Sequence, residues 1–320
     1  MKAIRVRKFG GPEELRLEEV PEPRPGAGQV AVRVRAAGVN PYETYIRAGS
    51  YASLPELPYT PGSDGAGTVH AVGEGVSSVR PGDRVYLAGS LSGTYAEYAL
   101  ALETQVHPLP ARLSFAQGAA LWVPYGAAYH ALVHQGGARP GETVLVHGAS
   151  GGVGCAAVQL ARALGLTVLG TAGTPAGREL ALAQGARAVF DHSSPGHFGE
   201  LERAAGGRGF DLVLEMLANV NLGGDLKLLA RGGRVVVIGS RGEAVIDPRD
   251  LMGRRGSIRA FTLWALAPEE EWEIHAYVGA GLASGALTPA VGREFPLAEA
   301  AAAQAAVMAR GAAGKIVLTA

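Results

Sequence analysis

The stretch TVLVHGASGGVGCAAVQLARALG, residues 143–165, decides the fold. A short apolar run comes first, then four glycines at positions 148, 151, 152 and 154, then an amphipathic run. This order predicts a β-strand, a tight turn and a helix N-terminus, where free amide groups and the helix dipole can meet a pyrophosphate. Glycine costs roughly 0.5–1 kcal/mol against alanine in regular structure, so a bound phosphate accounts for the cluster.

The closest match to the GxGxxG pattern is Ala-Ser-Gly-Gly-Val-Gly at 149–154, with alanine at the first glycine position. The strand before it and the helix after it are the context that a dinucleotide site requires. A tight turn without a ligand remains the alternative. The pattern gives five cofactor-binding candidates: Ser150, Gly151, Gly152, Val153 and Gly154.

From about residue 116, strand-like and helical runs alternate. Alternation of this kind predicts a parallel sheet with helices on both faces, a doubly wound α/β fold. The expected strands lie within 143–148, 166–173, 188–190, 211–217, 234–240 and 257–263, with helices ending at 163 and near 175–184, 197–205 and 220–230.

Residues 1–115 have a different sequence pattern. Period-two stretches such as MKAIRVRKF and QVAVRVRAAGV are separated by Pro/Gly turns, which predicts a β-rich, barrel-like or sandwich-like antiparallel domain. After about residue 265 come two helical runs and a final strand, KIVLTA.

The end of the second expected strand indicates the cofactor. An NAD-preferring site usually has Asp or Glu there, but residues 170–174 read Gly-Thr-Ala-Gly-Thr. An acid-free pocket with hydroxyl and cationic donors suits a 2′-phosphate and favours NADPH. The candidates are Thr171, Gly173, Thr174, Arg178 and His192. For Arg178 and His192, the alternative of an ordinary surface residue is equally consistent with the sequence.

Ligands in such sheets bind at the carboxyl ends of the strands. The fourth, fifth and sixth strand ends therefore add further candidates, although ordinary turns are the alternative. They are Asn219, Gly239, Ser240, Arg241, Phe261 and Leu263.

Charge and composition exclude several classes of partner. The 29 basic residues balance 29 acidic ones, so no nucleic-acid partner is expected. No apolar run is long enough to span a bilayer, and Cys155 as the single cysteine excludes an intrachain disulfide. We expect a cytoplasmic protein without a membrane partner.

Several motifs occur together in order: VNPYETYIRAGSY, PYTPGSDGAGTV, GDRVYLAGS, GTYAEYA, VHGASGGVG, EMLANVNL and VIGSRG. The chain resembles the zinc-independent quinone oxidoreductases, the zeta-crystallin type of medium-chain dehydrogenase/reductase. The resemblance implies a GroES-like catalytic domain, residues 1–115 plus 265–320, with a Rossmann domain, residues 116–264, inserted into it. It also implies a recurrent and structural Lys315.

The same resemblance indicates the chemistry. Zinc-dependent relatives have a ligating cysteine near Asn40 and a Gly-His-Glu motif, which here reads Gly-Ser-Asp at 62–64, so no metal is expected. By resemblance, Asn40 and Tyr45 lie near the nicotinamide, and Tyr51 matches a proton-donating tyrosine of related enoyl reductases. For these three catalytic candidates, packing or turn roles remain open.

Without a Lewis acid, alcohol oxidation is poorly supported, whereas reduction of an electron-poor acceptor needs mainly orientation. The expected function is NADPH-dependent quinone reduction. The alternative is NADPH-dependent reduction of enal, enone or enoyl-thioester double bonds, and an RNA-binding role is a third, disfavoured by the neutral charge. The strand at 257–263 is expected at a sheet edge, where it pairs two copies into a homodimer.

Overall fold

The computed structural model describes all residues, 1–320, and they form two compact units. The first comprises Met1–Val123, Thr288–Arg310 and Gly314–Ala320, and the second comprises Pro124–Leu287 and Gly311–Ala313. The chain therefore leaves the first unit after Val123, returns to it at Thr288 and leaves it again for the three residues Gly311–Ala313. None of its helices is both long and apolar enough to cross a membrane.

The first unit is built on a seven-stranded sheet with the order β14-β15-β3-β4-β5-β7, in which β6 also pairs with β3. Most of its pairings are antiparallel, while β14 and β15 run parallel. The strands of the seven-stranded sheet are β3 (Gln29–Gly38), β4 (Asp64–Val72), β5 (Arg84–Ala88), β6 (Tyr98–Leu102), β7 (Val106–Pro108), β14 (Val291–Pro296) and β15 (Lys315–Thr319). A separate two-stranded sheet consists of β1 (Lys2–Arg5) and β2 (Arg16–Glu19).

Strand β3 is central because it pairs with β4, β6 and β15. Its alternating valines are buried in one hydrophobic core, shared with residues from the C-terminal tail such as Phe295 and Leu318. The helices of this unit are α1 (Pro41–Ala48), α2 (Phe115–Gly118) and α10 (Ala300–Met308), with short helices η1 (Pro12–Glu14), η2 (Glu103–Gln105) and η5 (Leu297–Glu299).

The second unit contains a parallel six-stranded sheet with the order β10-β9-β8-β11-β12-β13. This is the doubly wound order in which the first and fourth strands are neighbours, and it confirms the expected fold class. The strands are β8 (Thr143–Val146), β9 (Thr167–Thr171), β10 (Ala188–Phe190), β11 (Phe210–Glu215), β12 (Leu229–Val237) and β13 (Ser257–Ala260).

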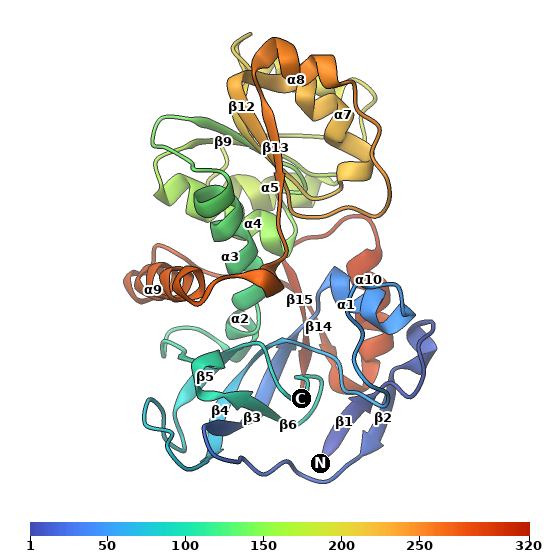
Figure 1. Cartoon of the computed structure of the whole chain (residues 1–320), viewed down its shortest axis with the longest axis vertical. Helices are drawn as coiled ribbons and strands as arrows, with labels where there is room; N and C mark the ends of the chain where they lie inside the picture. The colour runs from blue at the N-terminus through green and yellow to red at the C-terminus, as the bar shows by residue number, and fades with distance from the viewer. The chain divides into compact units, whose positions relative to one another are not determined.

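Helices α7 and α8 lie beside β12 and β13 (Figure 1). The helices are α3 (Trp122–Tyr129), which begins in the last residues of the first unit, a π-helix η3 (His130–Gln135), α4 (Gly152–Ala163), α5 (Pro175–Ala183), α6 (His197–Ala204), α7 (Ala218–Leu228), α8 (Pro248–Arg254), η4 (Leu263–Ala265) and α9 (Pro268–Ser284).

The unit boundaries differ from the expected ones in three places. Residues 116–123 belong to the first unit, and residues 265–287 and 311–313 belong to the second. Helix α9 contacts η3, and Tyr129 donates a hydrogen bond to Glu273 Oε1 at 2.8 Å. These contacts hold α9 on the second unit, and the sequence pattern of the helix alone does not show to which unit it belongs.

The sixth strand of the parallel sheet is also shorter than expected. It ends at Ala260, so Phe261 and Leu263 lie beyond it. The ring of Phe261 packs against His130 with ring centroids 4.6 Å apart, and Leu263 is buried in η4. Tertiary packing of these two side chains therefore ends the ladder earlier than the apolar pattern indicates.

Candidate active site

The glycine cluster forms the turn between β8 and α4. Gly151 is the N-cap of α4, and no side chain caps the first turn of this helix. Gly154 is required by packing, because a Cβ there would lie 2.1 Å from the carbonyl oxygen of Gly148. Gly151, Gly152 and Val153 are partly exposed, so an uncapped helix N-terminus is accessible to an anion. The turn therefore fits the pyrophosphate of a dinucleotide.

A series of buried polar side chains holds this turn in place. The amide of Gly148 lies 3.3 Å from Thr171 Oγ1, which lies 3.2 Å from His147 Nδ1. On the other side of the imidazole, His147 Nε2 lies 2.8 Å from Asp225 Oδ1. Thr171 is fully buried, so its side chain holds the loop in place from the end of β9.

Glu215, at the end of β11, completes this series. Its Oε2 lies 3.7 Å from His147 Nε2. Burial raises the pKa of Glu215 to about 8 and that of Asp225 to about 7, and burial lowers the pKa of His147. At neutral pH the cluster therefore holds a proton on a carboxyl group and keeps the imidazole neutral.

The ends of β9 and β10 bring together most of the candidates for the 2′-phosphate. A Cβ on Gly173 would lie 2.6 Å from His192 Nε2, so the two residues are in contact. Thr174 caps α5 by accepting a hydrogen bond from Gly177 N at 3.1 Å. The guanidinium of Arg178 pairs with Asp191 at 2.9 Å, a carboxylate that the sequence analysis did not consider.

The remaining candidates form turns at the ends of β11 and β12. Asn219 Oδ1 accepts a hydrogen bond from the amide of Arg241 at 2.9 Å, and Ser240 Oγ donates to Gly242 O at 2.8 Å. These contacts bring the two strand ends together beside Gly239. In the glycine turn, Ser150 Oγ donates to the carbonyl of Ala312 at 2.6 Å.

In the first unit, Asn40 is the centre of a buried polar network. It is 2% exposed, and its Nδ2 donates to Asp64 Oδ2 at 3.0 Å and to Glu43 Oε1 at 3.1 Å. Its Oδ1 accepts a hydrogen bond from Lys315 Nζ. Asn40 therefore fixes the start of α1 to strands β4 and β15.

Lys315 and Asp64 form a buried ion pair with 2.8 Å between Nζ and Oδ2. The second oxygen, Asp64 Oδ1, accepts from the amide of Val123 at 2.9 Å. Behind Asn40, the hydroxyl of Tyr95 donates to Glu43 Oε2 at 2.6 Å, and burial raises the pKa of Glu43. Sequence reasoning missed Tyr95, because only the fold brings it to Glu43 and Asn40.

These residues do not fit a zinc ion. The ammonium group of Lys315 lies where Asp64 would bind a cation, and Ser63 Oγ is hydrogen-bonded to Tyr42 OH. A catalytic zinc needs about three protein ligands of the Cys, His or carboxylate type. The positive charge of Lys315, which is buried and paired with the one carboxylate of the Gly-Ser-Asp motif, would repel a zinc ion at this place.

The two candidate tyrosines lie on and after α1. Tyr45 is on the helix and Tyr51 is in the loop that follows it, and both are partly exposed. The ring of Tyr51 lies 5.8 Å from that of Tyr42, measured between centroids, at an angle of 45°. Both side chains are therefore accessible to solvent, and the ring of Tyr51 packs beside that of Tyr42 on α1.

Two family models match the chain. Residues 26–111 match the alcohol dehydrogenase GroES-like domain, and residues 152–276 match the family described as zinc-binding dehydrogenase. These ranges fall in the two structural units. The second description names a metal whose ligands the residues above do not supply.

Proteins of known identity match over nearly the full length. The chain is 49% identical to the quinone oxidoreductase of Homo sapiens, over 99% of this chain and 97% of the relative. The structure of the Escherichia coli quinone oxidoreductase complexed with NADPH is similar, with a TM-score of 0.91, 30% identity and full coverage of both chains. An NAD-dependent alcohol dehydrogenase has a TM-score of 0.93 at 32% identity, also over both full chains.

These matches confirm the resemblance drawn from the motifs and confirm both parts of the expected architecture. The identity over 99% of the chain extends well beyond a shared fold. The chain therefore belongs to the quinone oxidoreductase family of the medium-chain dehydrogenases/reductases.

Proposed function

We propose that this protein reduces quinones with NADPH and without a catalytic metal. The human relative is a quinone oxidoreductase, and the similar Escherichia coli enzyme was crystallised with NADPH. The uncapped N-terminus of α4 fits the pyrophosphate of that cofactor. When bound, NADPH supplies the hydride, and the protein supplies binding, orientation and electrostatics.

The observation that carries the proposal is the buried Lys315–Asp64 ion pair, held by Asn40. This pair places a fixed ammonium group beside Asp64, the acidic residue of the Gly-Ser-Asp motif at 62–64. Zinc-dependent relatives have metal ligands in the corresponding motif. Alkoxide formation from an alcohol then has no Lewis acid to stabilise it. An acceptor that is already electron-poor, such as a quinone, needs only positioning beside the hydride donor.

Preference for NADPH rests on the ends of β9 and β10. No acid occupies residues 170–174, while His192 lies against Gly173 and Arg178 stands one helical turn after Thr174. Asp191 pairs with Arg178 and so holds the guanidinium in place. A 2′-phosphate receives hydrogen bonds from these donors, whereas the 2′-hydroxyl of NADH finds no acid among residues 170–174 at the end of β9.

In the first unit, Asn40 acts as a positioning residue, because its amide already binds Asp64, Glu43 and Lys315. It fixes α1, which carries Tyr45 and precedes Tyr51. The two phenols are the groups that contact the acceptor. Proton donation by Tyr51 is required for reduction of an enal double bond, whereas a quinone oxygen can take its proton from solvent.

The experiment compares kcat/KM for a quinone and for a 2-alkenal with NADPH, in the parent chain and in Tyr51→Phe. We expect the quinone to be the better substrate and Tyr51→Phe to leave its kcat/KM within about threefold. Tyr98→Phe, whose ring packs against His70 with 5.0 Å between centroids, is the matched control. A higher kcat/KM for the alkenal that falls in Tyr51→Phe alone would instead establish the double-bond reductase.

We also propose a homodimer formed through β13, and a cytoplasmic location. Strand β13 pairs only with β12, and Arg259 and Ala260 at its end are exposed, so its other edge is available to a second copy. The buried thiol of Cys155, without a partner cysteine, is compatible with a reducing compartment.

A further inference from the structure

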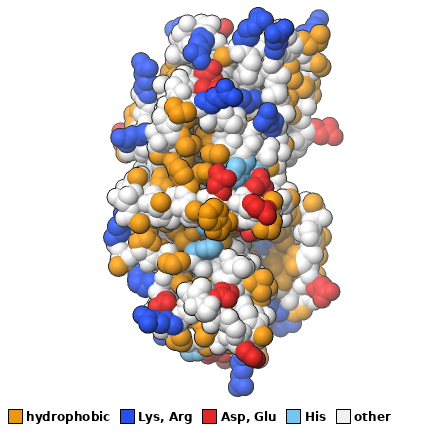
Figure 2. All heavy atoms as spheres, turned by 60° about the vertical axis from the view of Figure 1, so that its left-hand side comes forward, with side chains coloured by type: hydrophobic (Ala, Val, Ile, Leu, Met, Phe, Trp, Pro, Cys, Tyr) orange, Lys and Arg blue, Asp and Glu red, His pale blue; other side chains and the backbone are white.

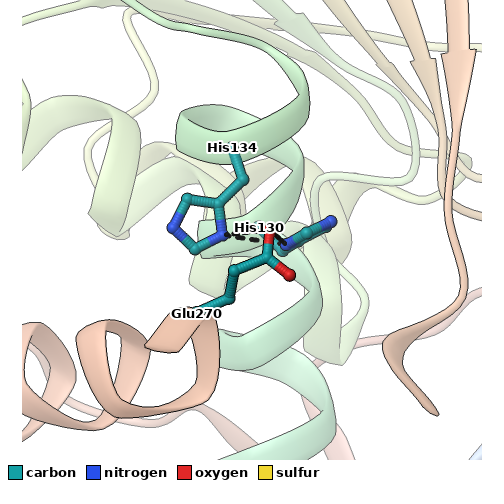
Figure 3. Close-up of side chains that lie close together, drawn as sticks. All are labelled: His130, His134 and Glu270. Atoms are coloured by element: carbon teal, nitrogen blue, oxygen red, sulfur yellow. Dashed lines mark hydrogen bonds and ion pairs between the residues drawn. The ribbon is translucent and has the colours of Figure 1, made fainter. Parts of the chain in front are cut away.

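The π-helix η3 and the start of α9 bring two histidines and a glutamate together. His130 and His134 lie one turn apart on η3, and Glu270 lies in the first turn of α9. Figure 3 shows both imidazoles and the carboxylate pointing toward one another. None of the three residues belongs to the cofactor or substrate candidates described above.

The three facing atoms have the spacing of metal ligands. His130 Nδ1 and His134 Nδ1 are 2.9 Å apart, and Glu270 Oε1 lies 3.8 Å from the first and 3.6 Å from the second. Ligands at zinc-bond lengths of about 2.1 Å stand roughly 3.4 Å apart in a tetrahedron. Small side-chain movements therefore bring all three atoms onto one ion.

Each of the three side chains is held by a second contact on its far side. Glu270 Oε2 accepts a hydrogen bond from the amide of Ala267 at 2.9 Å, so Oε1 faces the histidines. His134 Nε2 lies 3.2 Å from Glu273 Oε2, a carboxylate oxygen that can accept a hydrogen bond from a metal-bound imidazole. Gln135 Nε2 lies 3.0 Å from His130 Nε2, and turning this amide over places its oxygen there to accept from the Nε2–H of a metal-bound His130.

The three side chains become more exposed to solvent in the order His130, His134, Glu270. The side chains of His130, His134 and Glu270 are 3%, 12% and 33% exposed. The ring of Phe261 packs against His130, with 4.6 Å between the ring centroids. Figure 2, in which the side carrying α9 comes forward, shows acidic side chains gathered around a histidine. An ion can therefore enter from solvent and retain a water as its fourth ligand.

We propose that His130, His134 and Glu270 bind a divalent transition-metal ion, with Zn²⁺ as the best fit to two imidazoles and one carboxylate. The ion links α9 to η3 within the nucleotide-binding unit and is separate from the reaction. Ca²⁺ and Mg²⁺ are excluded, because they prefer oxygen ligands.

The test is titration of the full chain, stripped of metal, with Zn²⁺ by calorimetry, and with Co²⁺ by visible absorption. We expect one Zn²⁺ per chain and the intense absorption of tetrahedral Co²⁺. His134→Ala should weaken Zn²⁺ binding at least about a hundredfold, and Glu273→Gln about tenfold, as for other contacts behind a ligand. Ca²⁺ should produce no heat.

Glu270→Gln is the mildest variant, because its amide oxygen can still accept from Ala267 N. It should weaken Zn²⁺ binding about tenfold or more. Glu269→Gln, the same change at the neighbouring exposed position of α9, should alter it less than twofold. Zn²⁺ binding that is absent from the parent chain, or equal in the parent, His134→Ala and Glu270→Gln, would overturn the proposal. The second result would place the ion elsewhere, such as at the buried His147–Glu215–Asp225 cluster.

Discussion

Lys315 Nζ lies 2.8 Å from Asp64 Oδ2, although the two residues are 251 positions apart in the chain. The contact ties the last strand, β15, to the first residue of β4. Both side chains are almost fully buried, 5% and 1% exposed, so neither charge can be left without a partner. Asn40 binds both and makes the pair part of the buried polar network of the first unit.

Lys315→Met should therefore destabilise the fold strongly. Loss of one partner of a buried ion pair typically costs about 3–5 kcal/mol, because the other charge stays buried. Adding Asp64→Asn should restore part of the free energy of unfolding, as measured by urea denaturation. Lys8→Met, at a lysine whose side chain is 72% exposed, is the control. A change below about 1 kcal/mol in Lys315→Met, the size seen for exposed pairs, would argue against a buried pair.

The carboxyl cluster below the glycine turn predicts a pH dependence. The pKa of Glu215 rises from 4.5 to about 8 in the folded state, so its contribution is present at low pH and is lost as pH rises through about 8. His147, whose pKa is lowered by burial, acts in the opposite sense as pH falls below 6.5. In the parent chain, the contribution of Glu215 should therefore lower the free energy of unfolding as pH rises from about 4.5 to 8. In Glu215→Gln, this fall in the free energy of unfolding should be smaller by on the order of 1 kcal/mol or more.

Chemical denaturation at several pH values measures this difference. Glu294→Gln, at an exposed position of β14, should leave the slope unchanged. If the parent and Glu215→Gln have parallel stability curves across this range, the carboxyl group of Glu215 does not retain its proton on folding.

Cofactor preference gives a third prediction. NADPH should bind at least about tenfold tighter than NADH, a difference of about 1.4 kcal/mol. Arg178→Gln should weaken NADPH binding about tenfold and leave NADH unchanged, because only the 2′-phosphate uses the guanidinium. Arg203→Gln, on the exposed face of α6, is the control. Equal dissociation constants for the two nucleotides in the parent chain, by calorimetry, would remove the basis for the preference.

Gly152→Val tests the phosphate turn. The new side chain would stand at the first residue of α4, where the pyrophosphate approaches the backbone. NADPH binding should be lost while circular dichroism remains that of the parent. Gly199→Val, in helix α6 where nothing lies within 4 Å of an added Cβ, supplies the same substitution away from the turn. Normal NADPH binding by a folded Gly152→Val chain would move the pyrophosphate to another site.

The proposed dimer is tested by sedimentation equilibrium. Phe261 lies beyond the end of β13, so Phe261→Pro would disturb the packing of this ring on His130 and would not report on strand pairing. Arg259→Pro, within the strand and exposed, should instead shift the mass from dimer to monomer. A parent chain at monomer mass across micromolar concentrations excludes the dimer, and a dimer unchanged by Arg259→Pro has its interface elsewhere.

The sequence predicted the nucleotide-binding sheet well, because each of its strands is a short apolar run followed by a turn. The spacing of the glycines also placed α4 correctly, from Gly152 to Ala163. Residues that act through distant partners were harder to identify. The network of Glu43, Tyr95 and Lys315 forms only when strands far apart in sequence pair in one sheet.

Two local patterns in the sequence point to contacts that the structure shows. His130 and His134 have the four-residue spacing of metal ligands on a helix, although they lie outside the region in which zinc-dependent relatives carry their ligands. Asp191 follows the third strand directly, and only the structure shows that it pairs with Arg178. The apolar run at 257–263 overstated the length of β13, because Phe261 and Leu263 pack into the unit instead.

NADPH-dependent quinone reduction by this protein should need no metal. The measurement is the initial rate of NADPH oxidation with a quinone, before and after exhaustive dialysis against EDTA, with zinc content determined on the same samples. We expect the same kcat and KM in the metal-free chain, because Lys315 occupies the place of a cation beside Asp64. A rate that is lost on chelation and restored by stoichiometric zinc would show instead that the reaction depends on the metal.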